Sequence, residues 1–254
     1  MGDIIVKGGY VYDPLNGVKG DKMDVFLSGG KVVDEVKERG AKTVDASGKV
    51  VMPGGVDLHS HIAGSKINIG RLLRPEDHRR DVVPKTKYTR SGVGYSCPST
   101  FVTGYRYAQM GYTSVMEAAM PPLGARHVHE ELNDTPIVDK AGFTLFGNNH
   151  FTLKYVKEGD MEGLKAFIAW LLWATRGYAV KIVNPGGVEN WKWGRNVGGL
   201  DDLVYNYEVS PRQIVTSLAR ANEELGLPHT IHLHCNNLGV PGTHETTIET
   251  LDAV

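Results

Sequence analysis

The sequence predicts an α/β fold in which parallel strands alternate with helices. Five apolar runs have the length of buried strands, two amphipathic helices with clear ends lie between them, and glycine and proline mark the connections. The strand candidates are residues 56–62, 113–119, 143–149, 178–183 and 229–235. Alternation of this kind is typical of an open doubly wound sheet or of a (β/α)8 barrel.

The first fifty residues form a separate β-strand-rich segment. Short apolar runs are broken by the turn signals Gly8-Gly9, Asp13-Pro14 and Gly29-Gly30, and runs this short cannot form stable helices alone. The pattern of short apolar runs and turns changes at Pro53-Gly54-Gly55. We therefore expect one domain at 1–52, contributing to a small β-sandwich, and a second domain at 53–254.

Two helices of the second domain are defined by their ends. Asp160 is a helix cap, the apolar residues that follow have helical spacing, and Gly177 ends the helix. Ser210 with Pro211 begins another helix, which Gly226 ends. The charged segment 63–111 is either a long loop over the catalytic end of a barrel or a solvated surface insertion.

Composition narrows the partner classes and the compartment. The chain has 254 residues, with 28 Lys and Arg against 29 Asp and Glu, so it lacks the charge excess of a nucleic-acid-binding or polybasic membrane-binding protein. The longest apolar stretch, 166–174, is far shorter than the ~20 residues of a membrane span. The start of the chain lacks a secretory signal, and Cys97 and Cys235 cannot form a disulfide framework. These features predict a cytoplasmic protein.

The strongest chemical signal is a histidine pair at the end of the first barrel strand. His59 and His61 are two residues apart, so both imidazoles leave the strand on the same face and can hold one metal ion. A pair alone is weak evidence. Its position after an apolar run, where barrel active sites lie, strengthens it.

A lysine inside an apolar strand is the second signal. Burying the Lys181 ammonium group costs several kcal/mol unless the charge is compensated. The side chain can extend to solvent, pair with Glu117 or Glu189, or lose its charge. A neutral amine can form a Schiff base, or a carbamate with CO2 that presents two oxygens to divalent ions.

Histidines recur at the fifth strand. His232 and His234 again share a face, and each alone is more typical of a core residue than of a ligand. Three strand ends that present His, Lys and His in this order form a far more specific pattern. Asn149 and Asn236 also lie at strand ends, which makes them candidates for hydrogen bonds to a substrate.

These residues resemble the amidohydrolase superfamily, in particular its cyclic-amidase branch, whose binuclear centre is bridged by a carboxylated lysine. The resemblance extends to the A-subunit family of formylmethanofuran dehydrogenase. It is carried by the strings RPED at 74–77, PSTF at 98–101, GYRY at 104–107, MEAAMPP at 116–122, LFGNN at 145–149, KIVNPGG at 181–187 and HCNNLG at 234–239.

The resemblance implies an amidohydrolase-type (β/α)8 barrel with two zinc ions. His59 and His61 would bind one zinc ion, N6-carboxylysine at Lys181 would bridge both ions, and His234 would bind the other. The family interconverts formylmethanofuran with formate and methanofuran. Its partners are a tungsten- or molybdenum-containing subunit that forms formate from CO2, together with iron-sulfur subunits.

Two elements of the family pattern have no match in this chain. The family places a further zinc-binding His on the sixth strand. It also places on the eighth strand an Asp that transfers protons, and this Asp is expected beyond residue 254. Only about five βα units fit into the sequence, so we expect an amino-terminal portion of a longer subunit. The alternatives are a hydantoinase- or dihydroorotase-like cyclic amidase and a non-catalytic scaffold of the same fold. Iron, cobalt, nickel or manganese would also suit the ligands.

Overall fold

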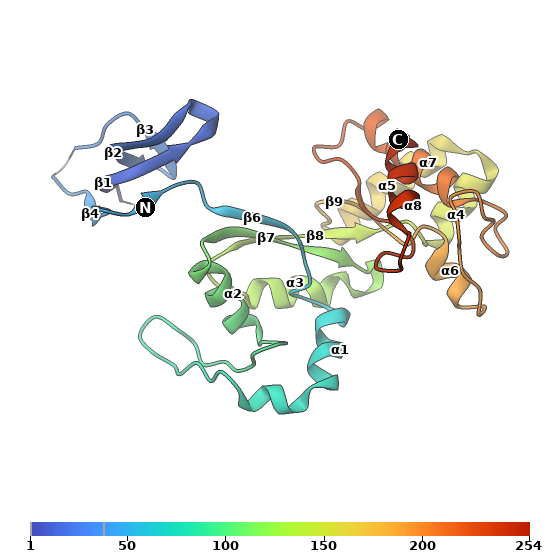
Figure 1. The fold of residues 1–254 in the computed structure, drawn as a ribbon, viewed down its shortest axis with the longest axis horizontal. Coiled ribbons are helices and arrows are strands. Elements are labelled where there is room, and N and C mark those ends of the chain that lie inside the picture. The colour runs from blue at the N-terminus through green and yellow to red at the C-terminus, as the bar shows by residue number, and fades with distance from the viewer. Residues whose placement is uncertain (1, 38) are drawn as a thin grey trace. The chain divides into compact units, whose positions relative to one another are not determined.

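The chain folds as two units, Met1–Gly55 and Val56–Val254. The computed structural model describes residues 2–37 and 39–254 (Figure 1). The boundary lies directly after the Pro53-Gly54-Gly55 segment. Each unit contains its own five-stranded sheet. The two sheets differ in whether neighbouring strands run parallel or antiparallel to each other.

The amino-terminal unit is a mixed sheet centred on its first strand. β1 pairs antiparallel with β2 and parallel with both β4 and β5, while β3 extends the sheet beyond β2. The strands are β1 (Ile4–Asp13), β2 (Val18–Ser28), β3 (Lys31–Val33), β4 (Lys42–Asp45) and β5 (Val50–Val51). Gly9 allows β1 and β5 to approach closely, because a Cβ there would lie 2.5 Å from Val51 Cγ2.

The second unit contains the strands that the apolar runs predict, in the order β10-β9-β8-β7-β6. The β7–β8, β8–β9 and β9–β10 pairs are parallel, as alternation with helices requires. The strands are β6 (Gly55–Ser60), β7 (Tyr112–Met120), β8 (Asp139–Leu145), β9 (Ala179–Val183) and β10 (His232–His234). The sequence therefore predicts the existence of these strands correctly.

The second sheet is strongly curled. β6 and β10 are its opposite edges, and five strands about 4.8 Å apart would separate those edges by nearly 20 Å in a flat sheet. Instead, Nε2 of His232 on β10 lies 2.9 Å from Nδ1 of His59 on β6. The sheet is thus a half-barrel whose two edge strands face each other.

Helices cover the outside of this half-barrel. α2 packs against β7, α3 against β8, α5 against β8 and β9, and α7 against β9 (Figure 1). The main core joins β9, α5 and α7 through side chains such as Ile182, Ile168 and Ile214, all fully buried. The helices are α1 (Ser65–Leu73), α2 (Thr100–Gln109), α3 (Ala125–Asp134), α4 (His150–Glu158), α5 (Met161–Thr175), α6 (Gly187–Trp191), α7 (Pro211–Glu224) and α8 (His244–Asp252), with short 3-10 turns at Pro14–Asn16, Pro75–Arg79 and Pro122–Gly124.

The predicted helix starts are confirmed, and some ends shift. Asp160 accepts a hydrogen bond from the Gly163 amide, and Ser210 forms a capping box with Gln213. The left-handed residue that ends α5 is Arg176 rather than Gly177. β8 ends at Leu145, short of the expected 143–149, because the chain turns there and Asn149 caps α4.

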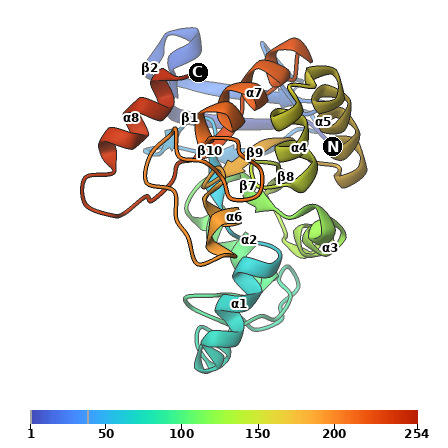
Figure 2. The same ribbon diagram turned by 90° about the vertical axis from the view of Figure 1, so that its right-hand side faces the viewer.

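The segment 63–111 is an ordered excursion between β6 and β7. It contains α1, the turn Pro75–Arg79, an irregular stretch and α2, and α1 with the irregular stretch extends away from the sheet (Figure 2). Asp77 is fully buried and accepts hydrogen bonds from the amides of Tyr95, Ser96 and Cys97. One carboxylate therefore fixes the two ends of the irregular stretch to each other.

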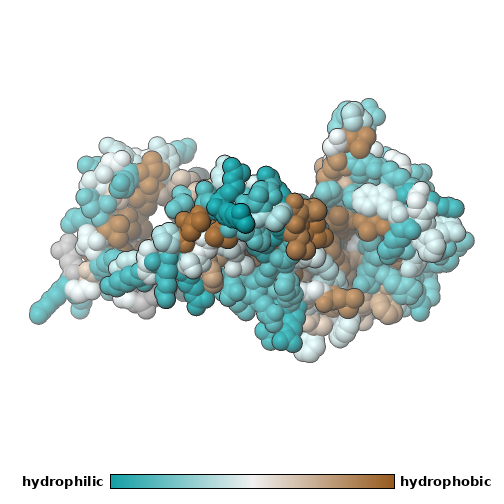
Figure 3. Space-filling model, turned by 90° about the horizontal axis from the view of Figure 1, so that it is seen from below, coloured by the Kyte–Doolittle hydropathy of each residue, from teal (hydrophilic) through white to brown (hydrophobic). Residues whose placement is uncertain are grey.

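The face seen in Figure 3 is largely hydrophilic with separate apolar patches. Leu123 and Tyr88 are among the large apolar side chains that are mostly exposed. Among the described residues, no helix is long and apolar enough to cross a membrane.

Candidate metal centre

The two histidines of the first barrel strand point the same way, as their spacing predicts. β6 ends at Ser60, and the rings of His59 and His61 have centroids 5.7 Å apart. Ser60, between them, points to the other side, where its hydroxyl donates to the Met116 carbonyl of β7 at 2.8 Å. This bond ties the end of β6 to its neighbouring strand and helps to place both imidazoles.

Lys181 lies in the middle of β9 and is 1% exposed. Its Nζ atom has no hydrogen-bond partner among the residues that the structure describes. The side chain therefore neither reaches solvent nor pairs with the two acids that the sequence suggested. Glu117 accepts hydrogen bonds from other donors, and Glu189 pairs with Lys192. A buried, unpartnered amine is costly in its charged form, which leaves loss of charge as the compensating route.

The histidines of β10 complete the cluster. His232 pairs in register with Lys181 of the adjacent strand, and His234 follows two residues later on the same face. The His234 ring centroid lies 6.4 Å from that of His59, and the His232 ring stacks on Phe143 at 4.7 Å. The structure thus gathers His59, His61 and His234, and the charge of Lys181 acts on the first and the last of them.

Burial and mutual repulsion favour the neutral forms of these groups. Burial and, after it, the positive charge of Lys66 lower the pKa of Lys181 to about 8. Partial burial, followed by the charge of Lys181, also lowers the pKa of His59 and of His234, and it lowers the pKa of His232 to about 4. At neutral pH these imidazoles carry free lone pairs, which metal coordination requires.

The donor set suits a metal centre that includes a modified lysine. Within residues 2–37 and 39–254, no three His, Cys, Asp or Glu side chains are gathered closely enough to hold an ion by themselves. Imidazole nitrogens and carbamate oxygens are suitable zinc ligands, and the Lys181 amine has no other partner in the structure. Carboxylation of Lys181 would supply the oxygen donors that the imidazoles lack.

The two asparagines have structural partners. Asn149 Oδ1 accepts a hydrogen bond from the Phe151 amide at 2.9 Å, and Asn236 Nδ2 donates to the Pro185 carbonyl at 2.9 Å. Asn236 is buried, while Asn149 lines a cleft. Their predicted contacts with a substrate stay predictions.

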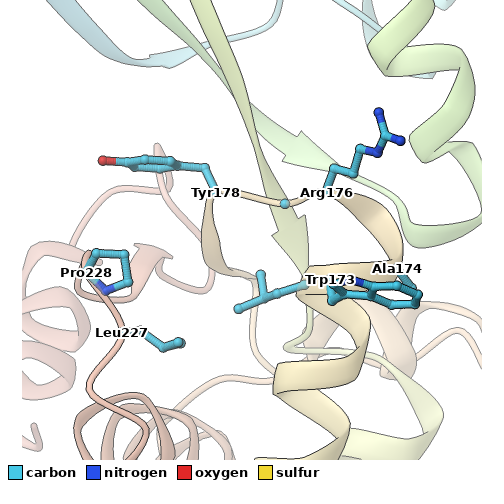
Figure 4. A pocket seen from close by; sticks show the side chains of 8 residues that line it. Trp173, Ala174, Arg176, Tyr178, Leu227 and Pro228 are labelled. Atoms are coloured by element: carbon cyan, nitrogen blue, oxygen red, sulfur yellow. The ribbon is translucent and has the colours of Figure 1, made fainter.

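Two cavities bear on where a substrate would enter. A cleft of about 570 Å³ lies where β8 and β9 end, and Lys66, Pro121, Asn148, Asn149 and Lys192 are among its lining residues. A second cavity, of about 710 Å³, lies where α5 ends and β9 begins, with Trp173, Tyr178, Leu227 and Pro228 around it (Figure 4). None of the predicted site residues lines this second cavity. The cleft is at the carboxyl ends of the strands, where barrel enzymes bind substrates.

The sequence interpretation missed two residues near the histidines. Glu117 was considered only as a partner for Lys181, yet it binds His61 instead, with 3.0 Å between His61 Nδ1 and Glu117 Oε1. The sequence feature that could have identified Glu117 is that it is an acidic residue within the apolar strand 113–119. Lys66, on α1, was not considered, although its charge acts on both Lys181 and His234.

Comparison with known proteins agrees with this fold. A model of the amidohydrolase family matches residues 42–254. Protein FwdA of Methanocaldococcus jannaschii is 58% identical over 252 residues, and the A-subunit of the formyltransferase/hydrolase complex Fhc of Methylorubrum extorquens is 37% identical over 250 residues. These matches cover 99% and 98% of this chain, and the chain spans 44% of the length of each relative.

A solved structure shares the whole fold. The crystal structure of the Methylorubrum extorquens complex FhcABCD with methylofuran contains a chain that superposes with a TM-score of 0.87 at 36% identity, over 99% of this chain and 45% of that one. The resemblance to the A-subunit family of formylmethanofuran dehydrogenase is confirmed. From its family match, its curled parallel sheet and these relatives, the chain belongs to the amidohydrolase family.

Proposed function

We propose that the protein containing this chain is a metal-dependent amidohydrolase that acts on a formamide, interconverting formylmethanofuran with formate and methanofuran. The observation that carries the proposal is Lys181, a fully buried amine without a hydrogen-bond partner, next to a cluster of imidazoles. The similarity of the chain to FwdA and to the Fhc A-subunit supports the choice of substrate.

Carboxylation of Lys181 accounts for its environment. The neutral amine attacks CO2, a C–N bond forms, and one proton leaves, so a carbamate anion replaces an amine that had no partner. A pKa near 8 leaves a substantial neutral fraction of this amine at mildly alkaline pH. The anion would be stabilised by the cations that it binds, since a buried charge requires a partner.

Each strand end then has a role in the proposed centre. His59 and His61 would hold one zinc ion, His234 the other, and carboxylated Lys181 would bridge them. When bound, the two ions supply Lewis acidity toward a formamide carbonyl and lower the pKa of water. The 570 Å³ cleft beside these strand ends would admit the substrate. We assign no proton-transfer residue among residues 1–254, because the family Asp has no counterpart there.

The proposed partners follow from the substrates. Formate would come from a tungsten- or molybdenum-containing subunit that reduces CO2, with iron-sulfur subunits supplying electrons, and methanofuran would bind from solution. FhcABCD, which holds a structural relative of this chain, is itself a complex of several chains. We propose such an assembly for this protein.

The test is to purify the full protein without chelators, measure bound metal, and assay release of formate from formylmethanofuran. We expect two zinc ions per chain, a carbamate carbon signal after exchange with 13C-bicarbonate, and formate release that a chelator abolishes. Hydrolysis of dihydroorotate or a hydantoin with no formate release would favour the cyclic amidase. A metal-free, inactive protein would favour the scaffold.

A further inference from the structure

Glu117 is a buried acid whose bonding fixes the orientation of a proposed metal ligand. It lies on β7, its side chain is 1% exposed, and its carboxylate contacts the β6 end across 54–56 residues of sequence. It makes four hydrogen-bond contacts. Oε1 lies 3.0 Å from His61 Nδ1 and 3.1 Å from the Ala119 amide, and Oε2 lies 2.8 and 3.1 Å from the amides of Ile62 and Ala63.

The four contacts determine where the protons are. Three of the partners are backbone N–H groups, which only donate, so both carboxylate oxygens already act as acceptors. Three N–H donors on one carboxylate stabilise its ionised form, and an ionised carboxylate can only accept, from the imidazole as well as from the amides. Nδ1 of His61 therefore carries its proton and donates it to Oε1. The lone pair of the ring is then on Nε2.

The same arrangement recurs at the other histidine of β6. Nδ1 of His59 is 2.9 Å from Nε2 of His232, whose ring is stacked on Phe143 and so cannot rotate freely. In both histidines at the end of β6, Nδ1 contacts a side chain from another strand of the half-barrel. This leaves Nε2 as the nitrogen that both rings have available for an ion.

We propose that Glu117 is a positioning residue, which holds His61 as the Nδ1–H tautomer so that Nε2 faces the metal centre. A carboxylate behind a ligating imidazole fixes the ring and raises its basicity, and loss of such a partner weakens metal affinity by about 10- to 100-fold. The inference rests on the proposed metal centre, and its first test below does not require a bound metal.

The first test reads the tautomer directly. The full protein is labelled with 15N-histidine and stripped of metal, and long-range 15N–1H correlation spectra identify the protonated nitrogen of His61, assigned by the signal lost in His61→Asn. We expect a protonated Nδ1 and a bare Nε2. A proton on Nε2 would overturn the proposal whether or not the protein binds metal.

The second test compares two buried carboxylates. Glu117→Gln places an NH2 group where two donors already point, and Asp77→Asn does the same at a carboxylate that also accepts three backbone amides but contacts no histidine. We expect both variants to melt at lower temperature and only Glu117→Gln to lose zinc affinity, by about 10- to 100-fold in competition with a chromophoric chelator.

The outcomes separate the two hypotheses. Equal zinc affinity in Glu117→Gln and the unaltered protein would overturn the role of Glu117 and leave the metal centre intact. An unaltered protein that takes up no zinc would instead contradict the proposed function. If Glu117→Gln does not fold, the tautomer of His61 in the unaltered protein still decides the inference.

Discussion

The half-barrel and the excursion at 63–111 hold their polar groups in different ways. In the half-barrel, strand register places the imidazoles, and Lys181 sits opposite His232 because β9 and β10 pair there. In the excursion, the irregular stretch is not part of a sheet and depends on Asp77, which accepts three amides from residues 95–97. Backbone pairing thus places the candidate ligands, whereas side-chain hydrogen bonds shape the segment beside them.

The largest effect should come from Lys181→Ala. The change removes the only proposed bridge between the ions, so we expect loss of binuclear metal loading and of formate release, with partial rescue by acetate in the cavity left behind. Elemental analysis and the formate assay measure this. Lys154→Ala on the exposed face of α4 is the matched control and should change neither. Full metal content in Lys181→Ala would exclude the bridging role.

His59→Asn tests a single strand-placed ligand. Asparagine at position 59 removes the imidazole nitrogens, so we expect loss of one ion and of activity, while the fold persists because residue 59 is exposed at the edge of the sheet. Metal analysis and circular dichroism report the two properties. His127→Asn, on α3, removes another exposed imidazole outside the cluster and should retain the metal. Undiminished metal in His59→Asn would make the β6 pair structural.

These two variants alter residues that the sequence identified, and the reason is local. Spacing of two along a strand places His59 with His61, and His232 with His234, on common faces whatever the rest of the fold does. Glu117 became informative only when β7 was placed beside β6, because its four donors come from different segments. The end of β8 was misplaced because Phe146 continues the apolar run, whereas the chain leaves the sheet after Leu145 and Asn149 caps α4.

Asp77→Asn tests the excursion by its pH dependence. Hydrogen bonds from the amides of Cys97, Ser96 and Tyr95 lower the pKa of Asp77. The stabilisation is therefore present above the unfolded-state pKa of about 4 and is lost as pH falls through the lower, folded-state value. Asp77→Asn should remove this acid-range dependence of the melting temperature and speed hydrogen exchange of the 95–97 amides. A melting profile that keeps the same pH dependence in the variant would show that other carboxylates cause it.

The smallest effect should come from Ser210→Ala, which removes one cap on the half-barrel's outer helices. The Ser210 hydroxyl accepts from the Gln213 amide, and the Gln213 side chain accepts from the Ser210 amide at 2.8 Å. Loss of the hydroxyl should lower the free energy of unfolding by about 1 kcal/mol, measured by denaturant titration. Thr216→Ala, within the same helix, is the control, because it removes a hydroxyl that does not cap the helix. Metal content should stay constant, because α7 packs on β9 through buried side chains that neither change touches. A loss of metal in Ser210→Ala would instead show that helix ends, and not strand register alone, position the ligands.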